Sequence, residues 1–250
     1  MRLLSYTGML GGILFALGLA GCATHSTNSS GQQVTTRAQA SAKVHTELAA
    51  MYYERTQLGV ALEEVGKALR AEPNYAPAYN VRGLVNMALH EDRQAEEDFQ
   101  HSLQLDNSDA GTHNNYGWFL CQRGKERDSI KHFMAALKNP LYATPEKSYV
   151  NAGVCSKKGG NAKDAEEFLQ KALILRPNMP EALLGLADMS FANGDYAGAK
   201  SYFMRFAQVS EPSSLTAEDL WLAVRIDRTR APLRWAANRR ERGEAMGGAK

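Results

Sequence analysis

Residues 110–136 of the chain, AGTHNNYGWFLCQRGKERDSIKHFMAA, hold a pattern that recurs along most of the sequence. Gly117 stands in the first half of this stretch, and Ser129 stands in the second half, four residues before Phe133. The residues equivalent to Gly117 are also small: Gly83, Gly153 and Ala187. Those equivalent to Ser129 are Ala61, Ala95, Ala165 and Ala199, and successive members of this second row lie 34, 34, 36 and 34 residues apart. A constant period of this length indicates a chain built from repeated units.

The period is typical of the tetratricopeptide repeat, a pair of antiparallel helices that cross closely enough to need small residues at the crossing. Phe99, Phe133 and Phe203 supply the Ala-x-x-x-Phe pattern of the second helix, and prolines fall near the repeat ends, where helices stop. We therefore predict an all-α, superhelical tetratricopeptide-repeat solenoid. Its five repeats are predicted to begin at Ala42, Ala76, Ala110, Glu146 and Pro180. A degenerate sixth helical pair is predicted to follow Leu215, with its second helix over residues 232–242.

The N-terminal residues predict export and lipid attachment. Arg2 precedes an apolar run too short to span a membrane as a mature helix, and the run ends in Leu19-Ala20-Gly21-Cys22. This arrangement resembles a bacterial lipoprotein signal, in which residues 1–21 are removed and Cys22 carries the acyl chains, such as palmitate; an ordinary signal peptide with a chance cysteine is the alternative. Ala23, in place of Asp, resembles lipoproteins that are passed on to the outer membrane. We expect a lipid-anchored protein of the outer membrane that faces the periplasm.

The composition of the remaining residues predicts three segments: a tether, a repeat domain and a C-terminal tail. Residues 22–41 are rich in Ser, Thr, Asn, Gln and Gly without apolar periodicity, which predicts a lipidated flexible tether. The repeat domain is expected over residues 42–242, and residues 243–250 are expected to be disordered. The arginine-rich segment 225–242 fits either the solvated outside of a terminal cap or a surface that docks an acidic partner or anionic head groups.

Charge and motifs exclude several classes of function. Lys plus Arg number 29 against 27 Asp plus Glu, and this near balance argues against a nucleic-acid partner. The histidines have no cysteine or carboxylate partners at metal-ligand spacing, and neither a phosphate-binding loop nor a nucleophile elbow is present in the sequence. We predict no catalytic residues, no metal, no cofactor and no small-molecule substrate, hence a protein that is not an enzyme and acts through protein–protein interaction.

The first helix of each repeat is expected to turn a fixed set of positions toward a concave groove. At these positions the sequence places apolar and amide side chains: Asn80, Leu84, Met87, Asn114, Trp118, Val150, Val154 and Leu184. Apolar side chains on a face that is normally solvated indicate a groove for an extended or helical partner segment, although packing between neighbouring helices is the alternative for any one of them. Asn80 and Asn114 occupy one position in successive repeats, where paired amides can hold a partner's backbone.

Cys121 and Cys155 fall on the first helices of adjacent repeats, which pack side by side. In an oxidising periplasm a disulfide between them is sterically conceivable. Two independent buried cysteines that act as small apolar residues are the alternative.

Taken together, these residues resemble the PilF/PilW lipoproteins of type IV pilus biogenesis. The most specific part is the third repeat, with Asn114-Asn115-Tyr116-Gly117 and the insertion Leu141-Tyr142-x-x-Pro145, followed by Asn151-x-Gly153. The resemblance implies a pilotin, an outer-membrane lipoprotein that binds the secretin subunit and promotes its membrane localisation and assembly. A periplasmic lipoprotein adaptor for cell-wall hydrolases or proteases would share the solenoid and the anchor and is the alternative.

Overall fold

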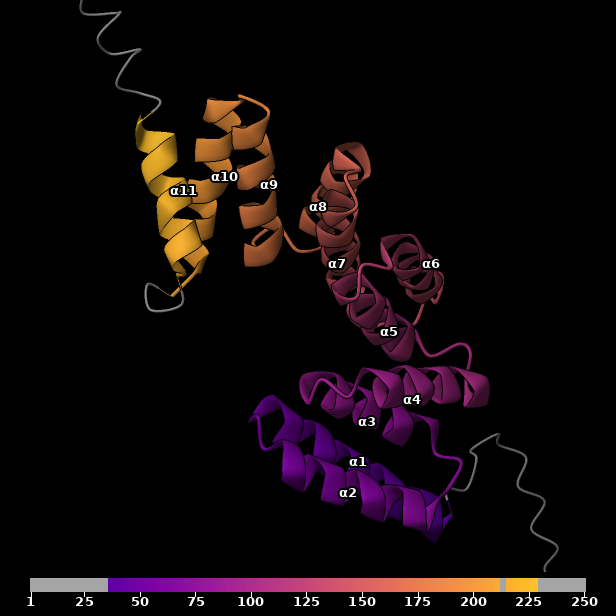
Figure 1. Cartoon of the computed structure of the whole chain (residues 1–250). Helices are drawn as coiled ribbons and strands as arrows, with labels where there is room; N and C mark the ends of the chain where they lie inside the picture. Colours follow the sequence, from indigo (N-terminus) through magenta and orange to yellow (C-terminus); the bar gives the residue numbers. More distant parts are fainter. Residues whose placement is uncertain (1–35, 212–214, 229–250) are drawn as a thin grey trace, which may run out of the picture. The chain divides into compact units, whose positions relative to one another are not determined.

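The structure is a computed structural model that describes residues 36–211 and 215–228 (Figure 1). Within these residues it contains eleven helices and no strand, which confirms the prediction of an all-α fold. None of the described helices is both long and apolar enough to cross a bilayer. The predicted signal peptide, the predicted tether up to residue 35, the second helix predicted over 232–242 and the predicted C-terminal tail lie outside the described residues.

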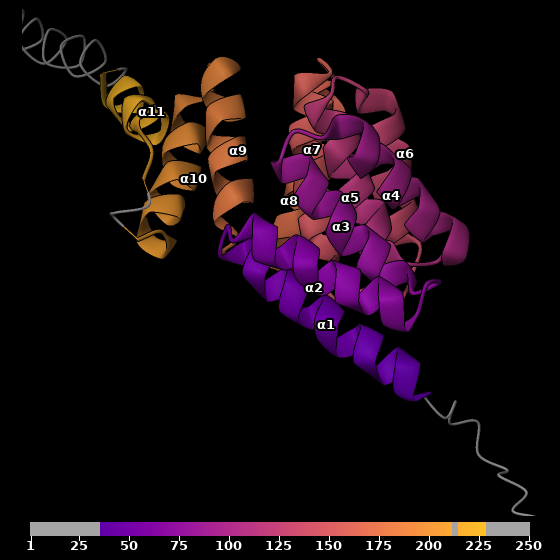
Figure 2. The ribbon, with the colours of Figure 1, turned by 60° about the horizontal axis from the view of Figure 1, so that its bottom comes forward.

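The helices form five consecutive antiparallel pairs and one further helix. The pairs are α1 (Arg37–Glu54) with α2 (Leu58–Ala71), α3 (Ala76–Ala88) with α4 (Asp92–Leu105), α5 (Ala110–Gln122) with α6 (Glu126–Leu137), α7 (Pro145–Lys158) with α8 (Ala162–Leu175), and α9 (Pro180–Ala192) with α10 (Tyr196–Val209). The further helix is α11 (Ala217–Arg228). Each first helix contacts the first helix of the next pair, so the pairs stack in chain order (Figure 2). This arrangement confirms the repeat solenoid.

The rows of small residues mark the places where paired helices cross. A methyl group added to Gly117 would lie 2.8 Å from the ring of Phe133, and one added to Gly153 would lie 2.7 Å from Leu169. Both distances are shorter than real Cβ contacts, and both Phe133 and Leu169 are buried. The period of the sequence therefore reflects a steric requirement at each crossing, where α5 meets α6 and α7 meets α8.

The turns between paired helices need a residue with positive φ. Gly124, Gly160 and Gly194 fill this position in the last three pairs, with φ between 74° and 80°. Thr56 and His90 fill it in the first two pairs, with φ of 60° and 62°. Side chains other than glycine are strained in this region, so the first two turns are the less favourable ones.

The first helix starts earlier than the sequence suggested. The repeat domain was expected from residue 42, but α1 begins at Arg37. Thr36 and Gln39 form a capping box, in which the backbone N–H of Gln39 donates to Thr36 Oγ1 at 3.1 Å and the backbone N–H of Thr36 donates to Gln39 Oε1 at 3.1 Å. Residues 37–41 are therefore helical and do not belong to a flexible tether, and the capping box satisfies the backbone N–H of Gln39 in the first turn.

Candidate functional site

The residues predicted to line the groove lie in different environments. Val150 is 5% exposed and belongs to a core cluster with Leu169 and Leu186. Its assignment to a binding surface was wrong, because α7 packs closely enough on α8 and α9 to cover it. Val150 contributes to stability instead.

Leu84, Met87 and Trp118 are half-buried and divide their surface between the core and solvent. Leu84 and Met87 pack against the aromatic cluster that contains Phe99, and Trp118 packs against the cluster that contains Phe133. These three side chains therefore serve the helix packing that was the alternative to a groove, and they offer only part of their surface to a partner.

The predicted pair of amides is part of a chain of hydrogen bonds within the protein. Asn114 is 8% exposed, and its Oδ1 accepts from Ser148 Oγ at 2.9 Å and from Asn151 Nδ2 at 3.0 Å. Asn115 Nδ2 donates to Asn80 Oδ1 at 3.1 Å and thereby extends the chain from α7 through α5 to α3. The expectation that Asn114 meets a partner's backbone was wrong, because its amide oxygen is already occupied. The amides join successive repeats.

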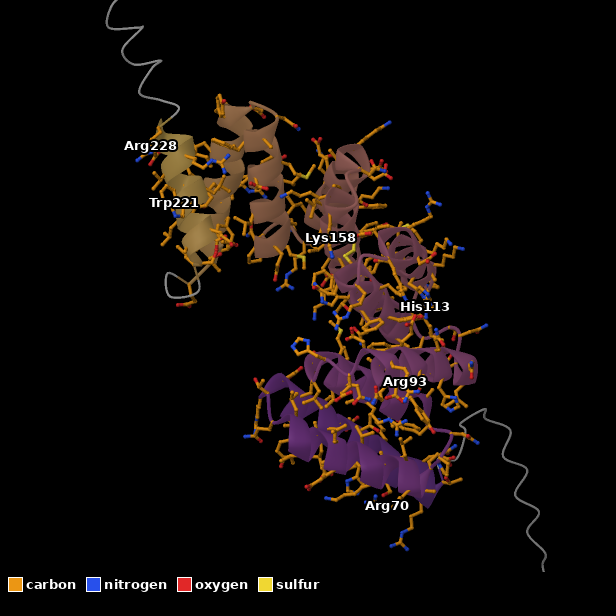
Figure 3. All side chains as sticks on the ribbon, viewed as in Figure 1. Arg70, Arg93, His113, Lys158, Trp221 and Arg228 are labelled. Carbon is orange, nitrogen blue, oxygen red and sulfur yellow. A yellow bond between two sulfur atoms is a disulfide. The ribbon has the colours of Figure 1, made fainter. Side chains whose placement is uncertain are left out.

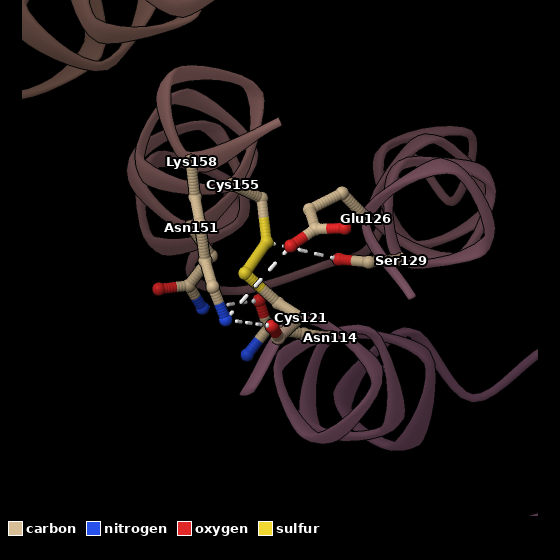
Figure 4. Close-up of a disulfide and its surroundings, with 7 residues drawn as sticks. All are labelled: Asn114, Cys121, Glu126, Ser129, Asn151, Cys155 and Lys158. Carbon is tan, nitrogen blue, oxygen red and sulfur yellow. Dashed lines mark hydrogen bonds and ion pairs between the residues drawn. A yellow bond between two sulfur atoms is a disulfide. The ribbon is translucent and has the colours of Figure 1, made fainter. Parts of the chain in front are cut away.

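Cys121 and Cys155 form a disulfide, with their Cα atoms 5.9 Å apart (Figure 4). Of the two alternatives left by the sequence, the structure therefore contains the bridge. Lys158 Nζ lies beside it and donates to the carbonyl oxygen of Cys121 at 2.6 Å. Ser129 Oγ lies 3.2 Å from Cys155 Sγ. The disulfide, the Lys158 contact and the Asn114–Asn151 hydrogen bond fasten α7 to α5, and the Ser129 contact joins α7 to α6.

A pair of histidines lies at the junction of α5 and α6. The Nδ1 atoms of His113 and His132 are 2.9 Å apart, and His113 Nε2 lies 3.1 Å from the carbonyl oxygen of Asn107. Burial, and then the proximity of His113, lower the pKa of His132 to about 4, so the His132 ring is neutral near pH 7. Across the described residues, no group of three or more His, Cys, Asp or Glu side chains is placed to hold a metal ion.

A pocket of about 790 Å³ lies between α7, α9 and α11. Two of the predicted groove residues, Val154 and Leu184, line it together with Trp221 and Leu222 of α11. Val154 is 39% exposed and Trp221, labelled in Figure 3, is 62% exposed, so both offer apolar surface to a ligand. The structure thus brings Val154 and Leu184 together, while Leu84, Met87 and Trp118 lie outside this pocket.

The contribution of α11 was missed by the sequence reasoning. The sequence predicted the residues after Leu215 only as the start of a degenerate sixth helical pair, not as part of a binding site. Residues 218, 221, 222 and 225 line the pocket, and their spacing of three and four places them on one face of a helix. That spacing was the signal that could have identified this face.

Comparisons with known proteins agree with the fold and extend it. A family model described as tetratricopeptide repeat matches residues 158–205. The type IV pilus assembly protein PilF of Pseudomonas aeruginosa is 27% identical over 213 residues, which cover 85% of this chain and 83% of PilF. An uncharacterised protein of Haemophilus influenzae is 24% identical over 169 residues, 65% of this chain and 87% of that protein.

Two of the similar solved structures are those of PilW and PilF. The crystal structure of PilW, described as a widely conserved type IV pilus biogenesis factor, has a TM-score of 0.70 and 29% identity, and the match covers 84% of this chain and 94% of PilW. A structure of Pseudomonas aeruginosa PilF has a TM-score of 0.73 and 24% identity, with coverage of 86% and 96%. The chain is therefore a PilF/PilW-like tetratricopeptide-repeat protein.

Proposed function

We propose that the chain takes part in type IV pilus biogenesis as a pilotin, a scaffold that binds the secretin subunit and promotes its membrane localisation and assembly. The observation that carries this proposal is the extent of the similarity to PilF, which covers 213 residues and so includes most of the repeat stack. A match confined to one repeat would indicate only the architecture. A match along the stack indicates that the order of repeats is also shared.

The proposed mechanism is tethering. Lipid attached to Cys22 holds the repeat domain at the outer membrane, and this raises the local concentration of a bound client at the membrane surface. The support for the anchor is the sequence Leu19-Ala20-Gly21-Cys22, which lies outside the described residues. Binding alone accounts for the action, and the proposal requires no chemical step from the repeat domain.

The test is complementation of a strain that lacks the gene. The unaltered chain should restore secretin multimers in the outer-membrane fraction, measured by immunoblotting without heat denaturation. Cys22→Ala should leave the protein present but release it from the membrane fraction, and secretin multimers should decrease. Normal multimers in the deletion strain would refute the secretin role and would leave an adaptor for cell-wall hydrolases or proteases as the alternative.

A further inference from the structure

The pocket between α7, α9 and α11 combines an apolar floor with a charged rim. Val154, Leu184, Trp221 and Leu222 form the floor. An indole that is 62% exposed beside aliphatic side chains is the kind of surface into which a partner inserts an aromatic or large aliphatic side chain. The volume of about 790 Å³ is large enough for such a side chain and its flanking residues.

The basic groups of the rim are already engaged. Lys157 forms an ion pair with Asp188 across α7 and α9. The guanidinium of Arg225 lies 4.2 Å from the centre of the Phe191 ring, in a cation–π contact. Lys157 is therefore balanced by a carboxylate of the chain itself, whereas the contact of Arg225 is with a ring and leaves its charge unneutralised.

Two acidic groups of the rim are not engaged. Glu181 and Glu218 are exposed, and neither forms an ion pair or hydrogen bond with any other residue of the described part of the chain. Asp219, a third carboxylate of the lining, accepts the backbone N–H of Thr216 at 2.8 Å. In total, four carboxylates and two cations line the pocket, which leaves a formal charge of −2. The net charge around the pocket is therefore negative.

We infer that this pocket binds a peptide segment of the client protein in which an aromatic or large aliphatic side chain stands next to Arg or Lys. The apolar side chain would pack on Trp221, Val154 and Leu184, and the basic neighbours would pair with Glu181 and Glu218. This inference rests on the proposed function, since it specifies the chemistry of the client segment. Charge complementarity selects such a segment over an acidic one, because an acidic segment would meet two unpaired carboxylates.

The segment that follows α11 in the chain contains a sequence of this chemistry, and it is a rival occupant. Residues 229–250 follow α11 directly and include Leu233-Arg234-Trp235. A segment joined to the pocket would compete with any separate peptide at a high effective concentration. The inference commits to a separate partner, and truncation of the chain after Arg228 separates the two cases.

The test measures peptide binding to the full lipidated chain in detergent by fluorescence anisotropy. The probe is a fluorescein-labelled dodecapeptide with a central tryptophan between two arginines; the matched probe carries glutamates in place of the arginines. We expect the basic peptide to bind and the acidic one not to bind. The double variant Glu181→Gln/Glu218→Gln should weaken binding by about three- to thirtyfold, and Trp221→Ala by about thirtyfold or more.

Two variants outside the pocket serve as controls. Glu54→Gln removes an exposed carboxylate of α1, and Leu141→Ala removes an apolar side chain that is 89% exposed. Both should bind the basic peptide like the unaltered chain, and circular dichroism should show the same helical signal for all variants. Unchanged affinity in the double glutamine variant, or equal affinity for both peptides, would overturn the inference. A rise of about tenfold or more after truncation at Arg228 would overturn it in favour of the chain's own tail.

A cellular measurement separates this inference from the proposed function. If the deletion strain lacks secretin multimers but the Glu181→Gln/Glu218→Gln variant restores them fully, the proposed function stands and this pocket is not the client site. If the deletion strain has normal multimers, the proposed function fails whatever the peptide measurements give.

Discussion

Replacing Gly153 by alanine should lower the free energy of unfolding by about 1–3 kcal/mol. A methyl group on Gly153 would lie 2.7 Å from Leu169 Cγ and 3.2 Å from the carbonyl oxygen of Ala165. The first atom is a branch carbon of a side chain that is 1% exposed, and the second belongs to the backbone, so neither can move aside without separating α7 from α8. Alanine favours the helix over glycine by about 1 kcal/mol, and this gain opposes the steric cost without matching it.

Gly59→Ala is the matched control, because no atom lies within 4 Å of the added methyl group. This variant should be unchanged or more stable by up to about 1 kcal/mol, since only the helix preference acts. Thermal unfolding followed by circular dichroism measures both variants. At about 2–4 °C per kcal/mol for a domain of this size, Gly153→Ala should unfold about 2–12 °C lower than the unaltered chain. A Gly153→Ala variant at least as stable as the unaltered chain would refute the steric explanation of the repeat pattern.

Three further changes test other contacts. Replacing both Cys121 and Cys155 by alanine should lower the free energy of unfolding by up to about 4 kcal/mol, which is the chain-entropy value for a bridge over 34 residues. Equal denaturation midpoints of the unaltered chain with and without reductant would contradict this. Because the pKa of His132 is lower in the folded chain, the unfolded chain binds a proton at this ring at a higher pH than the folded chain does, and stability should be lost as pH falls from 6.5 to about 4. The His132→Gln variant should show a smaller loss in melting temperature over that range. Asn114→Ala should lower the free energy of unfolding by about 1–3 kcal/mol, because it leaves the side-chain amide of Asn151 without its acceptor. Amide hydrogen exchange in α7 should become faster, and exchange equal to that of the unaltered chain would argue against the chain of amide hydrogen bonds.

The repeat architecture was predictable from the sequence because its cause is local and recurs. Every crossing imposes the same steric limit, so small residues such as Gly117 and Gly153 recur at a regular spacing. This spacing can be recognised in the sequence without three-dimensional information. The sequence signal for the start of α1 was weaker. Thr36 and Gln39 form a capping box within a stretch of polar residues, and composition suggested a tether up to residue 41.

The candidate site was only partly predictable, because a position on a helix does not determine how closely the next helix approaches. Val150 and Val154 are four residues apart on one face of α7, yet the first is 5% exposed and the second 39%. The hydrogen-bond partners of Asn114 could not be predicted from the repeat period either. The insertion in the third repeat places Tyr142 so that its hydroxyl lies 3.3 Å from Ser148 Oγ, beside the amide chain.

The covalent link between α5 and α7 has a mechanical consequence. A solenoid bends by small rotations at each boundary between repeats. A boundary held by the covalent Cys121–Cys155 bond resists rotation more than the neighbouring boundaries, which are held by side-chain packing, hydrogen bonds and exposed ion pairs. We therefore expect thermal bending to be smaller between α5 and α7 than at the boundaries on either side. Small rotations at those outer boundaries would change the distance between the N-terminal repeats and the pocket at α9 while the linked pairs keep their arrangement.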